Sequence, residues 1–332
     1  MTPHIRTAPL GQTGLDITRV GFGSWAMSGP NSPSYWGPQD DEVSIATIRH
    51  AIESGIGWID TAAVYGMGHA ERIVGAAVAS FRQEDRPLIF TKAGMRWDKE
   101  ASDASIRKSG RPESIRAEVD ASLERLGVER IDLYQMHWPA DDTDVAEYWA
   151  VFDELVKAGK VRAIGVSNHS IEQLEAAQAV APVGAIQVPL SLLNVASLDS
   201  VIPWAQRNGV GVLLYSPMAS GLLTGKYRAG SLDSLAEGDW RRRSPLFTPE
   251  NLVRVGRLTD VMREVASEHG ITVSAVAVAW ALAQPGVSAA IVGARTPEQI
   301  ADWIDAGRVE LPDDAVRRLD EARREHSAGA PW

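Results

Sequence analysis

The sequence contains no cysteine, no long uninterrupted hydrophobic run and no excess of positive charge. The lack of cysteine in all 332 residues excludes disulfides, thiolate nucleophiles and cysteine-ligated metals. The most apolar helical stretch, around residues 273–283, is too short to span a bilayer and is followed by Gln284 and Pro285. A formal net charge of −10 argues against nucleic acid or an anionic membrane as the main partner.

The composition is typical of a globular protein with a large core, because 45% of the residues are hydrophobic and 23% are charged. The N-terminal residues lack the apolar segment of an export signal, so we expect a cytoplasmic protein. The length suits one α/β barrel with inserted loops, and we predict a single domain over residues 1–332.

Short apolar runs alternate with amphipathic segments along the chain. Eight runs resemble strands buried on both faces: residues 18–22, 57–60, 88–91, 131–136, 163–166, 185–188, 211–215 and 289–292. Between them, apolar residues recur at helical spacing, as at Ile115, Val119 and Leu123. This alternation predicts right-handed crossovers and a parallel sheet, and eight units close a barrel. The predicted fold class is therefore α/β, a (β/α)8 TIM barrel.

An open, doubly wound sheet is the competing α/β fold. A glycine-rich phosphate loop after the first strand would favour it, but Gly21, Gly23 and Gly29 have the wrong spacing. We interpret these glycines as allowing close approach at the barrel mouth. Residues 6–17 predict an N-terminal hairpin that caps the barrel bottom, and the segment after Pro312 predicts extra C-terminal helix.

Four reactive side chains follow predicted strands: Asp60, Tyr65, Lys92 and His137. In an α/β barrel, the carboxyl ends of the strands converge on one active site. A carbonyl that accepts hydride needs a proton or a strong hydrogen bond at its oxygen. Tyr65 can donate that proton, and we expect Lys92 to lower its ordinary pKa of about 10. Asp60 would hold Lys92, and His137 would orient the carbonyl oxygen.

Six motifs, taken in order, resemble the aldo-keto reductase superfamily. They are DTAAVYG (60–66), IFTK (89–92), YQMHW (134–138), IGVSN (164–168), YSPMASGLLTGKY (215–227) and IVGARTPEQI (291–300). The resemblance spans roughly residues 10–304. The pairing of SGLLTGKY with GARTPEQ is similar to the bacterial branch related to inositol-operon reductases and potassium-channel β subunits.

The resemblance implies a barrel that binds a nicotinamide cofactor without a Rossmann fold, with Tyr65 as general acid/base. It implies Ser167, Asn168 and Gln187 on the nicotinamide carboxamide, and Tyr215 under the ring. The implied pyrophosphate loop contains Ser216, Leu222, Thr224, Gly225 and Lys226, and the implied adenosine end contains Gly293, Arg295, Thr296 and Gln299. A helix that begins near Pro297 would offer its free N–H groups to a 2′-phosphate.

The chain departs from the family pattern at the adenosine end. Asp302 and Trp303 stand where many members place Glu-Asn to bind adenine, and Gly293 replaces a lysine that often meets the 2′-phosphate. We expect Arg295 to compensate for that lysine. The sequence therefore favours NADP(H) as cofactor, with NAD(H) as the alternative.

Aromatic residues are expected to form the substrate rim. Trp25, Trp97 and Trp138 follow strands at the predicted mouth, where they would bind an apolar or flat carbonyl compound. Met27, Tyr35, Trp36 and Met95 are further candidates for the pocket. The arginine run at residues 241–243 and the long glycine- and charge-rich stretch at 219–250 lie between a strand and a helix. Such long loops are usually functional, although a charge run is usually a solvated loop face.

Our leading hypothesis is an NADP(H)-dependent oxidoreductase that interconverts aldehydes or ketones and alcohols. Its partner would be a small molecule, with no nucleic acid, membrane or metal involved, and the sequence leaves the oligomeric state open. The alternative is a cofactor-binding, redox-sensing regulatory subunit with little turnover, since channel β subunits resemble the chain. A metal-dependent hydrolase ranks last, because among 7 histidines only His137 is well placed.

Overall fold

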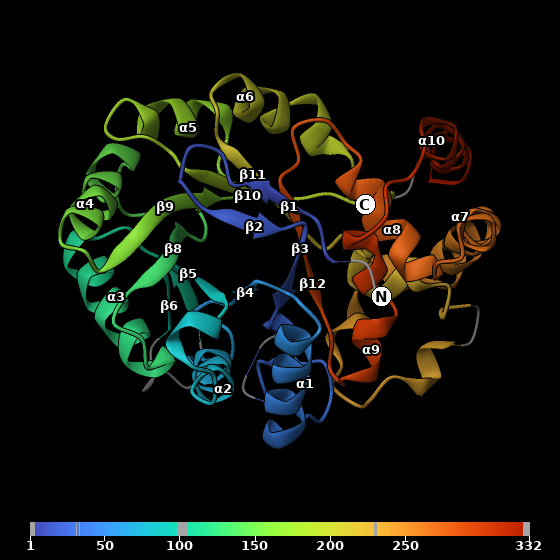
Figure 1. Cartoon of the computed structure of the whole chain (residues 1–332), viewed down its shortest axis with the longest axis horizontal. Coiled ribbons are helices and arrows are strands. Elements are labelled where there is room, and N and C mark those ends of the chain that lie inside the picture. The colour runs from blue at the N-terminus through green and yellow to red at the C-terminus, as the bar shows by residue number, and fades with distance from the viewer. Residues whose placement is uncertain (1–3, 31, 33, 98–104, 229–230, 328–332) are drawn as a thin grey trace.

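A computed structural model describes residues 4–30, 32, 34–97, 105–228 and 231–327. Its parallel strands close into a barrel surrounded by helices (Figure 1). The strands, in order around the barrel, are β3 (Val20–Gly23), β4 (Trp58–Asp60), β5 (Leu88–Ala93), β8 (Ile131–Met136), β9 (Val161–Ser167), β10 (Ala185–Pro189), β11 (Gly211–Tyr215) and β12 (Ala289–Gly293). The last strand pairs with the first, with Ala290 opposite Val20. The predicted (β/α)8 fold is confirmed.

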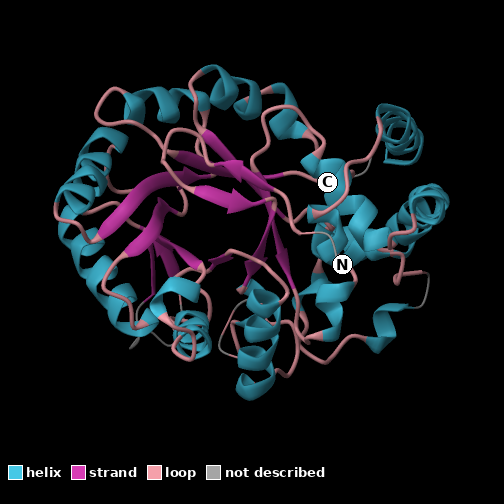
Figure 2. Ribbon diagram, in the orientation of Figure 1, coloured by secondary structure: helices cyan, strands magenta, loops and turns pink. Residues whose placement is uncertain are grey.

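Helices cover the outside of the barrel (Figure 2). They are α1 (Asp41–Glu53), α2 (His69–Val78), α3 (Pro112–Leu126), α4 (Val145–Lys157), α5 (Ile171–Gln178), α6 (Val201–Arg207) and α8 (Val273–Leu282). Pro112 begins α3, and Gly127 ends it with a left-handed φ of 64° that suits glycine. Outside this ring, α7 (Pro249–His269) packs against α10 (Asp313–Ser327).

Two helical features bear on the sequence-based expectations. The helix expected from Pro297 is a single turn, α9 (Glu298–Ala301), so it offers no extended helix N-terminus. Among the described residues, no single helix has both the length and the hydrophobicity to cross a membrane, although the bent pair α7 and α8 passes that test together.

Alternation along the strands separates the barrel interior from the outer layer. Successive side chains of a strand point to opposite faces, so every second residue points inward. Trp58, Phe90, Leu133, Ala185 and Leu213 belong to the buried interior cluster. Two residues after each of these side chains, on the same face of its strand, a polar or aromatic side chain lies toward the strand's carboxyl end. These side chains are Asp60, Lys92, Gln135, Gln187 and Tyr215. The alternation that fills the barrel interior thus places the candidate functional residues at the carboxyl ends of the strands.

The N-terminal hairpin closes the opposite end of the barrel. It pairs β1 (Thr7–Pro9) with β2 (Asp16–Thr18), as expected. Leu10 packs into the interior cluster and is fully buried. Gly11 approaches the strand starts so closely that a Cβ would lie 2.3 Å from the Gly211 nitrogen. Gly21 makes similar room inside the barrel for the Trp58 ring, rather than at the mouth as the sequence suggested.

Two segments form the mouth at the carboxyl ends of the strands. A short hairpin of β6 (Met95–Trp97) and β7 (Ile106–Lys108) follows β5, which the sequence analysis did not predict. The described residues of the 219–250 stretch include the 3-10 helices η4 (Ala219–Thr224), η5 (Ser231–Ser234), η6 (Trp240–Arg243) and η7 (Pro245–Phe247). Two residues of this stretch, Tyr227 and Arg241, lie at the barrel mouth.

Candidate active site

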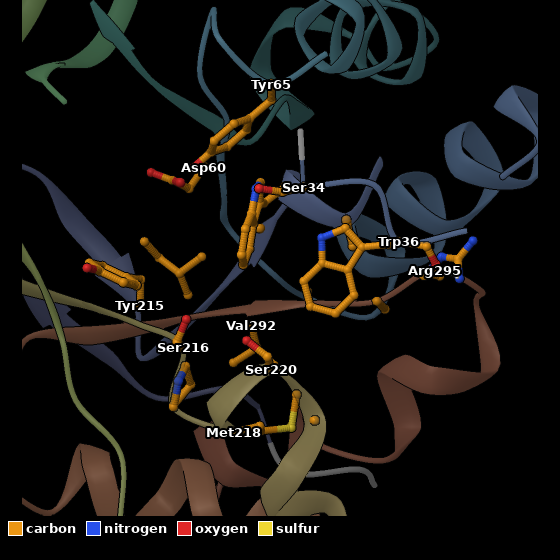
Figure 3. A pocket seen from close by; sticks show the side chains of 18 of the residues that line it. Ser34, Trp36, Asp60, Tyr65, Tyr215, Ser216, Met218, Ser220, Val292 and Arg295 are labelled. Carbon is orange, nitrogen blue, oxygen red and sulfur yellow. Dashed lines mark hydrogen bonds between the residues drawn. The ribbon is translucent and has the colours of Figure 1, made fainter. Parts of the chain in front are cut away.

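A cavity of about 650 Å³ opens at the carboxyl ends of the strands. Figure 3 shows Tyr65 beside Asp60 at one part of the cavity, with Tyr215 and Ser216 along another wall. Arg295 lies beyond Trp36, away from Tyr65. The cavity is therefore long enough to hold a reacting group near Tyr65 and the rest of a long ligand toward Arg295.

The buried base of the cavity is an ion pair between Lys92 and Asp60. The Lys92 ammonium lies 2.6 Å from Asp60 Oδ1 and donates to the carbonyl of Thr61 at 2.9 Å. Gln187 donates from Nε2 to the other carboxylate oxygen at 2.9 Å. Burial lowers the pKa of Lys92, although Asp60 opposes that shift. Both oxygens of Asp60 are thus held, as a buried carboxylate requires.

Tyr65 stands above this ion pair, with the Lys92 ammonium 5.4 Å from its ring centroid. Burial raises the pKa of Tyr65 well above its ordinary value, and Asp60 and Tyr215 raise it further. The expectation that the pKa of Tyr65 lies below its ordinary value is wrong, because burial of the phenol disfavours the charged phenolate. Tyr65 is therefore a neutral phenol that keeps its proton throughout the neutral range.

His137 follows β8 and meets Tyr65 edge to face, with ring centroids 5.7 Å apart. Burial lowers the pKa of His137 well below its ordinary value, and the Lys92 ammonium lowers it further. The imidazole is neutral at neutral pH and has one N–H to donate. The two rings can therefore offer two hydrogen-bond donors to one oxygen atom without carrying a charge.

Asn168 joins three strand ends beside these rings. Its backbone is left-handed, with φ 63°, a conformation that asparagine tolerates better than most residues. The side-chain amide donates to the His137 carbonyl at 3.1 Å and to Ser167 Oγ at 2.9 Å. Its oxygen accepts from the Tyr215 hydroxyl at 2.9 Å. The amide that we expected to face a ligand is engaged within the protein, where it fixes the cavity wall.

The segment after β11 carries unusual backbone conformations. Ser216, Ala219 and Ser220 have φ of 54°, 47° and 55°, and Gly221 follows with φ 99°. Strained residues of this kind cluster at ligand sites, and such turns present N–H groups to anions. Lys226 lies at the end of this segment, 2.5 Å from the Asp302 carboxylate. This wall therefore suits an anionic group.

The far end of the cavity is formed by the loop after β12. The Arg295 guanidinium donates to Gln39 Oε1 at 2.9 Å and to the Trp36 carbonyl at 2.8 Å. It also donates to the carbonyls of Gly37 and Pro38. Arg295 thus binds the loop after β3 while it lines the cavity.

Most of the expected ligand-binding residues line this cavity. They are Ser167, Asn168, Gln187, Tyr215, Ser216, Thr224, Lys226, Gly293, Arg295 and Gln299, together with Asp60, Tyr65, His137, Trp25 and Trp138. Lys92 lies beneath the wall. Leu222 is buried in the core, and Gly225, Thr296 and Trp97 are also outside the lining. The structure thus brings together the four reactive side chains and most, but not all, of the implied cofactor positions.

The sequence analysis missed a bridge from Arg241 to Trp36, which joins two loops that line the cavity. Arg241 is buried, pairs with Asp239 at 2.6 Å and donates to the Tyr227 hydroxyl at 2.7 Å. Its guanidinium lies 4.6 Å from the Trp36 ring centroid. Trp25, Trp36 and Trp240 pack together beside it, with ring centroids 5.1 to 5.8 Å apart. The DWR motif at 239–241 was the available signal, because a carboxylate two residues before an arginine can pair with it.

The part of the chain that the structure describes contains no group of three or more His, Asp or Glu side chains arranged to hold a metal ion. The polar groups of the cavity are instead hydroxyls, amides, one neutral imidazole and paired charges. Such groups suit an organic ligand with several hydrogen-bonding groups and an anionic middle. The positive-φ segment after β11 and the polar strand ends fit a dinucleotide of that description.

Comparisons with known proteins agree with this geometry. Residues 19–324 match the aldo/keto reductase family. The chain is 39% identical over 294 residues to the aldo-keto reductase YhdN of Bacillus subtilis, which covers 88% of this chain and 85% of that protein. It is 34% identical to an NADH-specific methylglyoxal reductase of Escherichia coli, over 93% of this chain and 95% of the relative.

A solved glycerol dehydrogenase from Gluconobacter oxydans superposes with a TM-score of 0.88 at 36% identity, covering 98% of this chain and 97% of that structure. The family match over residues 19–324 includes all eight barrel strands, from Val20 to Gly293. The chain belongs to the aldo/keto reductase family.

Proposed function

We propose that the protein is a nicotinamide-dependent oxidoreductase that reduces aldehydes or ketones to alcohols, or catalyses the reverse reaction, with Tyr65 as the general acid/base. One observation carries the proposal: the neutral donors Tyr65 and His137 face the same cavity directly above the buried Lys92–Asp60 pair. A carbonyl oxygen placed between the two rings would receive hydrogen bonds from both.

The chemistry divides between the cofactor and the chain. When bound, a reduced nicotinamide would supply the hydride, with both electrons of the new C–H bond at the carbonyl carbon. Tyr65 transfers its hydroxyl proton to the oxygen, so the C=O double bond becomes an alcohol, and water returns a proton to the phenolate. His137 orients the oxygen through its N–H. The Lys92 ammonium, 5.4 Å from the Tyr65 ring centroid, would offset part of the cost of the transient phenolate.

The chain has residues of its own to hold such a cofactor. Gln187 and Ser167 lie near the reacting end and Tyr215 offers an aromatic face, while the segment after β11 suits the pyrophosphate. Gln187 can serve two purposes, because its Nε2 holds Asp60 while its amide oxygen can accept from a carboxamide. The reduced cofactor is NADH or NADPH, and both supply the same hydride.

The substrate region is lined by Trp25, Val64, Met95, Ile106 and Trp138. This mostly apolar surface suits the body of a small aldehyde or ketone whose carbonyl reaches Tyr65. The relatives named for methylglyoxal and glycerol make these two compounds and their carbonyl or alcohol counterparts suitable first members of a panel.

The test is turnover of a carbonyl panel with NADH and with NADPH, followed by the absorbance of the reduced cofactor. Tyr65→Phe is the matched control, since it removes one hydroxyl and keeps the ring. We expect substrate-dependent oxidation in the natural protein and a loss of about 10²-fold or more in the variant. If the protein binds the cofactor but oxidises it with no member of a broad panel, the redox-sensing subunit becomes the better description.

A further inference from the structure

At the adenosine end of the cavity, the cations that the structure describes already have protein partners: Arg295, Lys226 and Arg241. We infer that this site selects NAD(H), the dinucleotide without a 2′-phosphate, over NADP(H). The inference rests on the proposed function, because only a nicotinamide-binding cavity makes this choice. It reverses the preference for NADP(H) that the sequence favoured, which depended on a free Arg295.

Both the side chain and the backbone of Arg295 form hydrogen bonds with the loop after β3. The guanidinium donates to Gln39 and to the carbonyls of residues 36–38. Gln39 in turn donates from Nε2 to the Arg295 carbonyl at 2.9 Å. Turning the guanidinium toward a phosphate would leave these partly buried acceptors unpaired, and unpaired buried acceptors cost free energy.

The neighbouring positions offer nothing to replace it. Gly293 has no side chain, and the Gln299 side-chain oxygen accepts from the Arg295 backbone N–H at 2.8 Å. Thr296 lies outside the cavity lining and forms a hydrogen bond that lowers the pKa of the exposed Glu298 carboxyl. Glu298 therefore adds a negative charge to the turn from which we expected only N–H donors.

The two remaining cations near this end are each neutralised. Lys226 pairs with Asp302, and Arg241 pairs with Asp239. Asp302 lines the cavity, and its carboxylate is partly exposed there. A phosphate monoester carries about −1.5 to −2 charge at neutral pH, so it would meet Asp302 without a free counter-charge. A ribose hydroxyl is uncharged and can instead donate to this carboxylate.

Binding titrations of NADH and of NADPH test the inference without turnover. Quenching of tryptophan fluorescence is a suitable signal, because Trp25, Trp36 and Trp303 line the cavity. We expect NADH to bind at least about tenfold more tightly than NADPH, a difference of about 1.4 kcal/mol. NADPH binding as tightly as NADH, or more tightly, would overturn the inference and leave the proposed function intact. If neither dinucleotide binds, the proposed function itself is overturned.

Two variants separate the roles of the charged residues. Asp302→Asn should reduce the ratio of NADH affinity to NADPH affinity by about fivefold or more. The substitution removes the carboxylate that would repel the 2′-phosphate, and it frees Lys226. The control is Asp305→Asn, which removes the same charge from a residue outside the cavity lining and should leave the ratio within about twofold.

The second variant is Arg295→Leu. A guanidinium that serves only as a tie between loops affects both cofactors alike, so the affinity ratio should stay within about threefold. Selective loss of NADPH affinity would identify Arg295 as the phosphate ligand and contradict the inference. Circular dichroism of each variant verifies that the barrel is folded.

Discussion

Gln187 donates a hydrogen bond to the same carboxylate that holds Lys92: its Nε2 lies 2.9 Å from Asp60 Oδ2, opposite the ammonium at Oδ1. The interior of β10 thus fixes an ion pair that spans β4 and β5. Since Tyr65 stands over this pair, Gln187 is connected to the reacting end of the cavity through Asp60.

We predict that Gln187→Leu weakens both stability and turnover. The substitution leaves Asp60 Oδ2 unpaired in the barrel interior, which should lower the free energy of unfolding by about 1–3 kcal/mol. The measurement is urea denaturation, together with kcat on the best carbonyl substrate. Gln187→Glu is the matched comparison, because it keeps the shape and adds a charge beside Asp60. Unchanged stability in Gln187→Leu would show that this hydrogen bond contributes nothing.

The raised pKa of Tyr65 predicts the pH dependence of carbonyl reduction. A general acid must be protonated, and a pKa above the ordinary value keeps the phenol protonated to higher pH. Reduction should therefore show no decline from Tyr65 ionisation until the pH exceeds about 10, the ordinary tyrosine pKa. The profile of kcat/KM against pH is the measurement. A falling limb near neutral pH that disappears in Tyr65→Phe would contradict this expectation.

His169 should make the protein less stable in acid. Its Nδ1–H donates to the Ser167 carbonyl at 2.8 Å, and its Nε2 accepts from the Tyr148 hydroxyl at 2.7 Å. Burial lowers the pKa of His169 to about 4. Below the ordinary histidine pKa of about 6.5, the unfolded chain binds a proton that the folded chain refuses. The stabilisation is complete above that pH and is lost as the pH falls toward about 4.

The loss in free energy of unfolding that His169 causes in acid should be on the order of 3 kcal/mol, since one pKa unit corresponds to about 1.4 kcal/mol. Free energies of unfolding at several pH values between these limits measure it. His169→Gln retains a polar side chain but cannot titrate, so its stability should vary less over the same range. Equal acid sensitivity of the two proteins would assign the effect to other groups.

The Arg241 bridge should slow the release of bound cofactor. Arg241→Leu removes the contact with Trp36 that joins the 219–250 stretch to the loop after β3, and the ion pair with Asp239 that holds the guanidinium in place. We expect a cofactor dissociation rate about tenfold higher, measured by stopped-flow fluorescence, with a smaller effect on association. Arg243→Ala is the control, because Arg243 is exposed and does not line the cavity. Equal dissociation rates in the two variants would exclude a role for the bridge.

The strand ends were predictable because their pattern is local. Alternation along each strand determines that Asp60, Lys92 and Gln187 point inward, and the (β/α)8 closure brings inward-facing residues together. The order of the eight strands and the N-terminal hairpin followed from the same reasoning. These features depend on hydrophobic spacing and turn residues, which are visible in the sequence.

The contacts of the charged side chains were not predictable in the same way. Arg295 was expected to face a phosphate, but its partners lie at residues 36–39, a contact that no local pattern encodes. Arg241 belongs to a run that looks solvated, yet its pairing with Asp239 and its position over Trp36 bury it. The pKa of Tyr65 likewise depends on how deeply the folded chain buries the phenol, which no local pattern encodes.

The tie between Arg295 and Gln39 joins residues 256 positions apart in the chain. It lies beside the seam at which β12 pairs with β3. A chain growing on the ribosome therefore exposes seven barrel strands before the eighth can complete either the barrel or the ligand cavity. Fragments that end before Ala289 lack both the closed barrel and the complete ligand cavity. We therefore expect that interrupted synthesis or a proteolytic cut before Ala289 leaves a fragment that does not bind the ligand.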